Sequence, residues 1–115
     1  MRMREIVAVM MTVASVTHTS AATVTLKMLS SGPAEKTGLY AIGVFDAADV
    51  YANALGIADK WADCLDRLKI TAKDAVEGAI ELGRKHPRLA EQPAAAVMLM
   101  HINLRCGFIT SIPDQ

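Results

Sequence analysis

The sequence predicts an all-α fold, a small single-domain helical bundle held together by one disulfide and preceded by an N-terminal signal peptide. Three observations in this chain of 115 residues support the prediction. Apolar residues recur at three- and four-residue steps, glycine and proline separate the stretches in which they do so, and only two cysteines occur. Residues 22–28 come nearest to the alternation of a strand, but they fit a first helical turn equally well.

Residues 1–22 have the three-part layout of a secretory signal peptide. Arg2 and Arg4 precede an apolar run over residues 6–16, and small and polar residues follow. The run is too short for a transmembrane helix, which needs about 20 residues. We therefore expect cleavage just before or after Ala22, export to the periplasm and no membrane association afterwards. The mature domain is then residues 23–115.

The predicted mature domain is close to neutral. Of twelve basic and twelve acidic residues, Arg2, Arg4 and Glu5 belong to the signal peptide, which leaves ten basic and eleven acidic side chains. These charges are interspersed along the chain, and such a balance offers no basic surface to nucleic acid or to an anionic membrane. We expect neither as a partner.

Cys64 and Cys106 are the two cysteines. In an oxidising compartment an even pair is most simply a disulfide. Closing a loop of about 42 residues would stabilise the fold by about 4 kcal/mol on the chain-entropy estimate. The alternative is two buried free thiols, and this interpretation gains much weight if the chain is not exported.

The first long helix is expected over residues 34–55. It follows the sequence Ser-Ser-Gly-Pro, in which Ser31 can cap the helix and Pro33 suits its first turn. Gly56 provides a stop. Apolar residues at three- and four-residue steps predict one buried face, formed by Leu39, Ile42, Phe45, Ala48, Tyr51 or Ala52, and Leu55.

The second helix is expected over residues 71–85. Thr71 and Asp74 have the spacing of a capping box, with a negative charge at the positive end of the helix dipole. Gly78 and Gly83 lower the helix propensity, and we interpret them as points of close approach to a neighbouring helix. Ion pairs are expected on the solvent side, between Lys73 and Glu77 and between Glu81 and Lys85.

The third helix is expected over residues 93–105. It is apolar on most sides, and such a helix is usually central and buried. Met98 and Met100 are interpreted as core residues, because methionine beside leucine and valine commonly fills a core. Gly107 provides the stop.

Patterns of catalytic or metal-binding residues are weak. His86 and His101, together with the two cysteines, lack the close spacing of zinc ligands. A thiol nucleophile at Cys106 with a histidine base is an alternative, although export to an oxidising space argues against it. We expect a protein that is not an enzyme, with no catalytic residues, no metal and no cofactor.

The segment between the first two long helices combines charges with the only tryptophan. We expect residues 56–69 to be a connector held in place by Cys64. Asp59, Lys60 and Trp61 are the candidate partner-binding residues, because an amphipathic aromatic residue among charges is a frequent interface anchor. The alternative is that Trp61 packs beneath the connector.

Several motifs occur in a recognisable order over most of the mature domain. They are a Tyr-x-x-Gly-Val motif beginning at Tyr40, the cysteine pair, and a His-Pro followed by Pro-Ala ahead of the third helix, within residues 39–47, 63–82 and 86–108. In order and spacing these segments resemble the Rap/Tai family of immunity proteins. Members of that family are small, exported, helical proteins that protect bacteria against amidase effectors of the type VI secretion system.

The resemblance implies a divergent member of the family, because Leu65 stands where a proline is usual and a second cysteine pair is absent. It also implies a periplasmic protein that inhibits a peptidoglycan amidase by occluding its active site. In such a complex we expect Asp59, Lys60 and Trp61 in the contact, because an aromatic residue among charges is a frequent interface anchor. The partner would be the effector amidase. The sequence does not decide whether the protein is a monomer or a homodimer. The alternative function is an exported structural or stress-related helical domain with no enzyme target.

Overall fold

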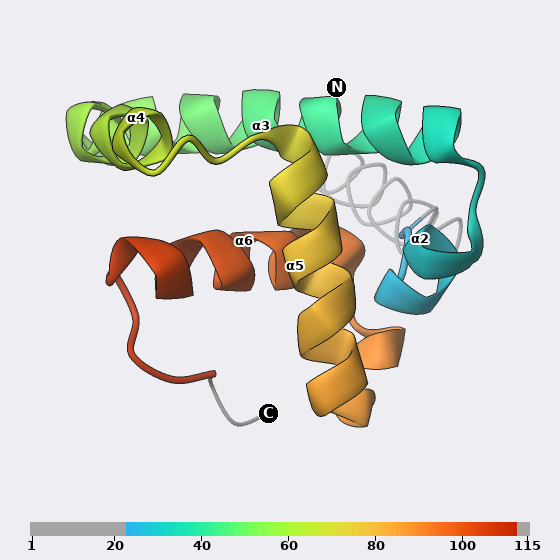
Figure 1. Cartoon of the computed structure of the whole chain (residues 1–115). Helices are drawn as coiled ribbons and strands as arrows, with labels where there is room; N and C mark the ends of the chain where they lie inside the picture. The colour runs from blue at the N-terminus through green and yellow to red at the C-terminus, as the bar shows by residue number, and fades with distance from the viewer. Residues whose placement is uncertain (1–22, 113–115) are drawn as a thin grey trace, which may run out of the picture.

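The computed structural model describes residues 23–112, so the predicted signal peptide lies outside the described residues. Within that range the chain is helical without a strand, which confirms the predicted all-α fold class (Figure 1). None of the helices described there is long and apolar enough to cross a bilayer. The elements are α2 (Leu26–Ser31), α3 (Ala34–Ala54), α4 (Ala58–Arg67), α5 (Ala72–Lys85), the 3-10 helix η1 (Pro87–Glu91) and α6 (Ala94–Cys106).

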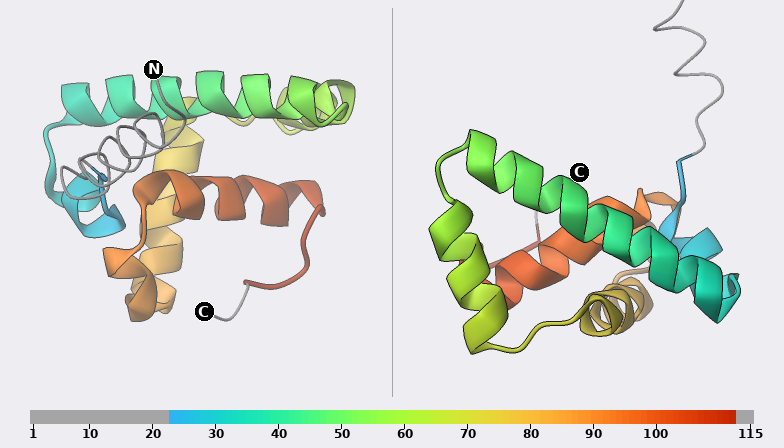
Figure 2. Two further views of the ribbon diagram at one scale, coloured as in Figure 1. Left: turned by 180° about the vertical axis from the view of Figure 1, so that it is seen from behind. Right: turned by 90° about the horizontal axis from the view of Figure 1, so that it is seen from above.

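The helices cross one another at steep angles. α3 lies along one side of the molecule with α4 at its C-terminal end, and α6 lies beneath α3 (Figure 2). α5 runs across both of them and packs most extensively against α6. α2 and η1 pack together against the far part of α5. The segment at residues 22–28 is therefore the start of helix α2, where Thr25 caps the helix and forms an isolated bridge with Pro93.

α6 forms the centre of the core, as the sequence predicts. Met98 is fully buried and Met100 packs against the core from its edge. Gly107 has a φ of 73°, in the left-handed region that ends a helix. The fully buried side chains of α6 are those of Ala94, Val97, Met98 and Ile102.

α5 has the predicted N-terminal cap. The Thr71 hydroxyl accepts a bond from the Asp74 backbone N–H at 3.2 Å, and the Asp74 carboxylate accepts one from the Thr71 backbone N–H at 3.0 Å. Together they form a capping box. The expected solvent-side ion pairs are also present, Lys73 with Glu77 at 3.8 Å and Lys85 with Glu81 at 4.0 Å.

The two glycines of α5 allow close packing, which confirms their interpretation. A β-carbon at Gly78 would collide with the imidazole ring of His101 on α6. One at Gly83 would collide with the Leu26 side chain on α2. Two helices therefore pack directly against the backbone of α5.

The start of α3 differs from the prediction. α3 begins at Ala34 after Pro33, without a side-chain cap. The Ser31 hydroxyl instead donates to the Lys27 carbonyl at 3.0 Å and so belongs to the end of α2. The helix α2 has only six residues and ends at Ser31. So short a helix has too few residues to show a helical pattern in the sequence, and it was therefore not predicted. The predicted stop at Gly56 is confirmed, with a φ of 74°.

The buried face of α3 was predicted only in part. Ala52 is buried, and Phe45 and Ala48 pack against the core, as expected. The helix α3 is apolar nearly all the way round, so the spacing of its apolar residues does not indicate which side is buried. This is why part of the prediction was wrong. The core takes the side with Ala41 and Val44. The other predicted residues are exposed, Leu39 by 73%, Ile42 by 53%, Tyr51 by 72% and Leu55 by 67%.

Candidate functional site

The predicted connector over residues 56–69 is mostly a helix, α4. Its buried side chains, Trp61 and Cys64, are three residues apart and share one face, and charged residues occupy the other. That spacing is the signal in the sequence that could have revealed the helix. Asp59 and Lys60 lie in the first turn of α4 and are exposed.

Trp61 is inside the protein. Its residue is 5% exposed, and its indole Nε1–H donates to the Asp49 carboxylate on α3 at 3.0 Å. The sequence left open whether Trp61 is an exposed interface anchor or packs beneath its own segment. In the structure it packs beneath that segment. Trp61 therefore does not lie on the same surface as Asp59 and Lys60, and it attaches α4 to α3.

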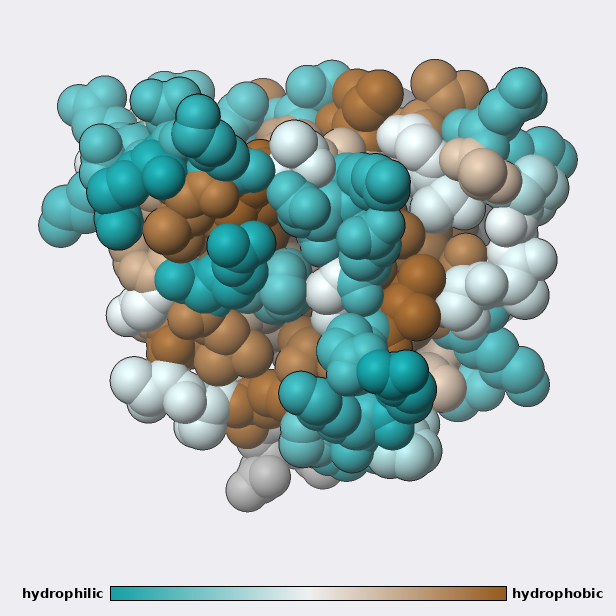
Figure 3. Space-filling model, in the orientation of Figure 1, coloured by the Kyte–Doolittle hydropathy of each residue, from teal (hydrophilic) through white to brown (hydrophobic). Residues whose placement is uncertain are grey.

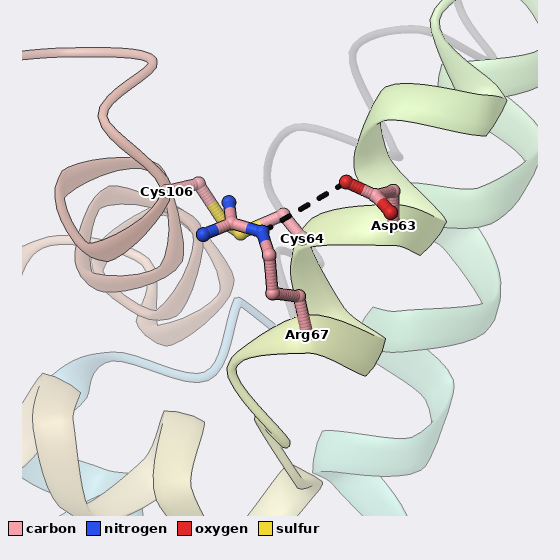
Figure 4. Close-up of a disulfide and its surroundings, with 4 residues drawn as sticks. All are labelled: Asp63, Cys64, Arg67 and Cys106. Atoms are coloured by element: carbon pink, nitrogen blue, oxygen red, sulfur yellow. Dashed lines mark ion pairs between the residues drawn. A yellow bond between two sulfur atoms is a disulfide. The ribbon is translucent and has the colours of Figure 1, made fainter.

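The disulfide between Cys64 and Cys106 is present, as the sequence predicts. The two Cα atoms are 5.9 Å apart, and the bond joins α4 to the last residue of α6 (Figure 4). Cys64 is 2% exposed. Because both cysteines of the chain are in this bond, Cys106 has no free thiol for the nucleophilic alternative.

α4 is thus held on its inner side at two points, one turn apart. Its outer side is polar, and Asp63 and Arg67 form an exposed ion pair there at 3.9 Å (Figure 4). Such an exposed pair contributes little to stability, so these charges are available to a partner. We call this exposed side the α4 charged face, formed by Asp59, Lys60, Asp63, Asp66 and Arg67.

A second surface is apolar and was not expected from the sequence. It lies on the outer side of α3, where large apolar side chains are exposed. Apolar side chains are visible along the upper edge of the molecule, where α3 runs (Figure 3). A groove of about 490 Å³ lies beside them, between α3 and α6. The Tyr40 hydroxyl crosses between these helices and accepts a bond from the Ala95 backbone N–H at 3.1 Å.

His101 lies at the contact between α5 and α6. Burial lowers the pKa of its imidazole, and the nearby positive charge of Arg105 lowers it further, while the negative charge of Asp74 acts in the opposite direction. The neutral imidazole is therefore the form that the fold favours. Among residues 23–112, no three side chains of the metal-ligating types come together.

A further groove of about 430 Å³ lies where α2, α3 and α5 meet. Its walls include Leu29, Ala41, Val76 and Ile80, with the Lys73 and Glu77 pair at the side. It is mostly apolar and brings together no set of reactive side chains.

Comparison with known proteins yields no match to a family model, to a curated protein or to a solved structure. The resemblance to the Rap/Tai family, and the amidase partner that it implies, stay predictions from the sequence motifs.

Proposed function

We propose that this chain is a periplasmic immunity protein of the Rap/Tai type, which binds a peptidoglycan amidase effector of type VI secretion and occludes its active site. In this proposal it performs no catalysis and needs no cofactor. The order and spacing of the sequence motifs support the proposal, and so does the construction of α4. The Cys64–Cys106 disulfide fits an oxidising compartment such as the periplasm.

The rigid mounting of α4 is the observation that carries the proposal. Trp61 and the Cys64 disulfide both hold its inner side, so the helix that carries the α4 charged face is fixed in place before a partner arrives. Binding then costs little conformational entropy, which raises the affinity. We assign the contact to Asp59 and Lys60 at the start of α4, and we assign to Trp61 the role of holding them in place.

The first prediction tests this contact. The mature protein should inhibit peptidoglycan hydrolysis by an amidase encoded beside it, and the double variant Asp59→Ala, Lys60→Ala should inhibit at least tenfold less well. Interface anchors typically have effects of this size. Inhibition is measured by titrating the amidase, and binding by calorimetry.

The matched control is Lys73→Ala with Glu77→Ala. It removes an exposed pair of opposite charges from α5 instead of α4 and should inhibit like the unaltered protein. Equal inhibition by both double variants would overturn the assignment to α4. Failure to bind or inhibit any co-encoded amidase would favour the alternative, an exported structural or stress-related helical domain.

A further inference from the structure

The helix α4 has weak local signals at both of its ends. Its N-cap residue, Ile57, forms no side-chain bond to the first turn, whereas α5 begins with a capping box. At the other end the chain turns through Lys69 with a φ of 54°, a backbone conformation that favours glycine. A helix of ten residues is also marginal in water by itself. Attachments to the rest of the protein must therefore keep α4 folded.

Two attachments on opposite neighbours hold α4. On the side of α3, the Trp61 ring is buried and its N–H group donates to the Asp49 carboxylate. On the side of α6, the Cys64–Cys106 bond makes the connection (Figure 4). Because α4 packs mainly on α3, the disulfide is its principal link to α6.

Most of the core is formed by the other helices. α4 supplies two buried side chains to it, Trp61 and Cys64. The remaining buried residues lie mainly in α2, α3, α5 and α6, and the most extensive contact is that between α5 and α6. These helices can therefore stay packed together if α4 loses one of its attachments.

We propose that the Cys64–Cys106 bond is a redox-sensitive switch for the order of α4. While the bond is intact, α4 is folded and fixed to both α3 and α6. When the bond is reduced, α4 is released and loses its order, while α5 and α6 keep their packing. The consequence for amidase binding rests on the proposed function, but the release of α4 does not.

Reduction of the bond requires a dithiol as the electron donor. Cys64 is 2% exposed, whereas Cys106 lies partly at the surface, so a thiolate of the dithiol attacks the Cys106 sulfur. A mixed disulfide forms on Cys106, and Cys64 leaves and takes up a proton. The second thiol of the dithiol then displaces Cys106 as a thiol, and the dithiol becomes an intramolecular disulfide. Two electrons and two protons pass to the protein in total.

The switch restricts inhibition to the oxidised protein. Asp59 and Lys60, the proposed contact, lie on the α4 charged face. A released α4 has to be ordered again when it binds, which costs entropy and lowers the affinity. Before export a chain is in a compartment that keeps thiols reduced. The protein thus acquires its binding face only after it reaches an oxidising compartment.

Hydrogen exchange followed by mass spectrometry tests the release of α4. The mature protein and the double variant Cys64→Ala, Cys106→Ala are each compared with and without dithiothreitol. In the reduced protein, the amides of residues 58–67 should exchange within about tenfold of the rate in an unstructured chain, while those of α5 and α6 stay protected. The double variant is the control, because it has no bond to reduce. It should show this pattern with and without the reagent.

Two results would overturn the switch. Protection of residues 58–67 that survives reduction would show that α4 does not need the bond. Loss of protection in α5 and α6 as well would show that the whole domain unfolds, without a separate release of α4.

The effect on binding is measured with the co-encoded amidase and the double variant, so that no reductant enters the enzyme assay. The double variant should inhibit at least about tenfold less well than the disulfide-bonded protein, because α4 has to be ordered on binding. Equal inhibition by the two would contradict redox control and leave the proposed function intact. Absence of inhibition by the disulfide-bonded protein would contradict the proposed function, and the exchange data would then decide the switch.

Discussion

Trp61 shows how one side chain can stabilise a surface without being part of it. Its indole ring is buried, and its N–H group is bonded to Asp49 on the neighbouring helix. The ring thus supplies apolar burial, and the N–H fixes the rotation of α4 on α3. The sequence singled out Trp61 as the only tryptophan, in a charged segment. Whether its side chain is exposed or buried depends on how α4 is rotated against α3, which the sequence does not give.

The second prediction separates these two contributions at Trp61. Trp61→Phe keeps most of the apolar burial and removes the bond to Asp49, so the free energy of unfolding should fall by about 1 kcal/mol. Trp61→Ala also leaves a cavity and should cost about 3–5 kcal/mol. Urea unfolding followed by circular dichroism measures both values.

Lys60→Ala provides the control for this series, because Lys60 is the exposed neighbour of Trp61. Its effect should stay within about 0.5 kcal/mol. A Trp61→Ala protein as stable as the unaltered one would show that the indole is not a core residue.

At the scale of the helices, the contact of α5 with α6 depends on a glycine and a histidine. The imidazole of His101 occupies the space that a side chain at Gly78 would fill. Asp74 on α5 and Arg105 on α6 are the charged groups that act on it. The ring is half-buried there, so a proton on it is less well solvated than in the unfolded chain.

The third prediction follows from the lowered pKa of His101. Its ordinary value is 6.5. Because the folded pKa lies lower, the unfolded chain binds more protons between the two values, and stability decreases as pH falls through this window. The full contribution is present above the unfolded value. The free energy of unfolding should therefore decrease from about pH 7.5 to about pH 5.5.

Two histidine variants test whether His101 causes this pH dependence of the free energy of unfolding. His101→Gln should flatten the dependence, whereas His86→Gln, outside the contact of α5 with α6, should leave it unchanged. Thermal and urea unfolding across the pH range measure the difference. A slope that survives in His101→Gln would show that another group causes it.

The accuracy of the sequence predictions differs from helix to helix for physical reasons. The ends of α5 and α6 were predictable because Thr71, Asp74 and Gly107 are local signals that act within one turn. The buried side of α3 was not predictable, because both of its sides are apolar and the packing of the neighbouring helices determines which side is buried. For the candidate site, the disulfide was predictable from the number of cysteines, but the burial of Trp61 depends on packing against α3.

At the scale of the whole molecule, the disulfide joins parts of the fold that otherwise make few contacts. α4 packs mainly on α3, and the Cys64–Cys106 bond joins it to the end of α6 across a sequence separation of 42 residues. The core is small, with the buried side chains of α6 at its centre. A cross-link over a long loop therefore matters more here than it would in a larger domain.

The fourth prediction concerns this bond. The mature protein in its native state should contain no thiol that an alkylating reagent can reach, and replacing both cysteines by alanine should lower the free energy of unfolding by about 2–5 kcal/mol. The reason is that the unfolded chain regains the freedom that the closed loop removes, while α4 loses its attachment to α6. Mass spectrometry after alkylation and urea unfolding provide the two measurements. Two reactive thiols in native periplasmic protein, or a double variant as stable as the unaltered chain, would show that the fold does not depend on the cross-link.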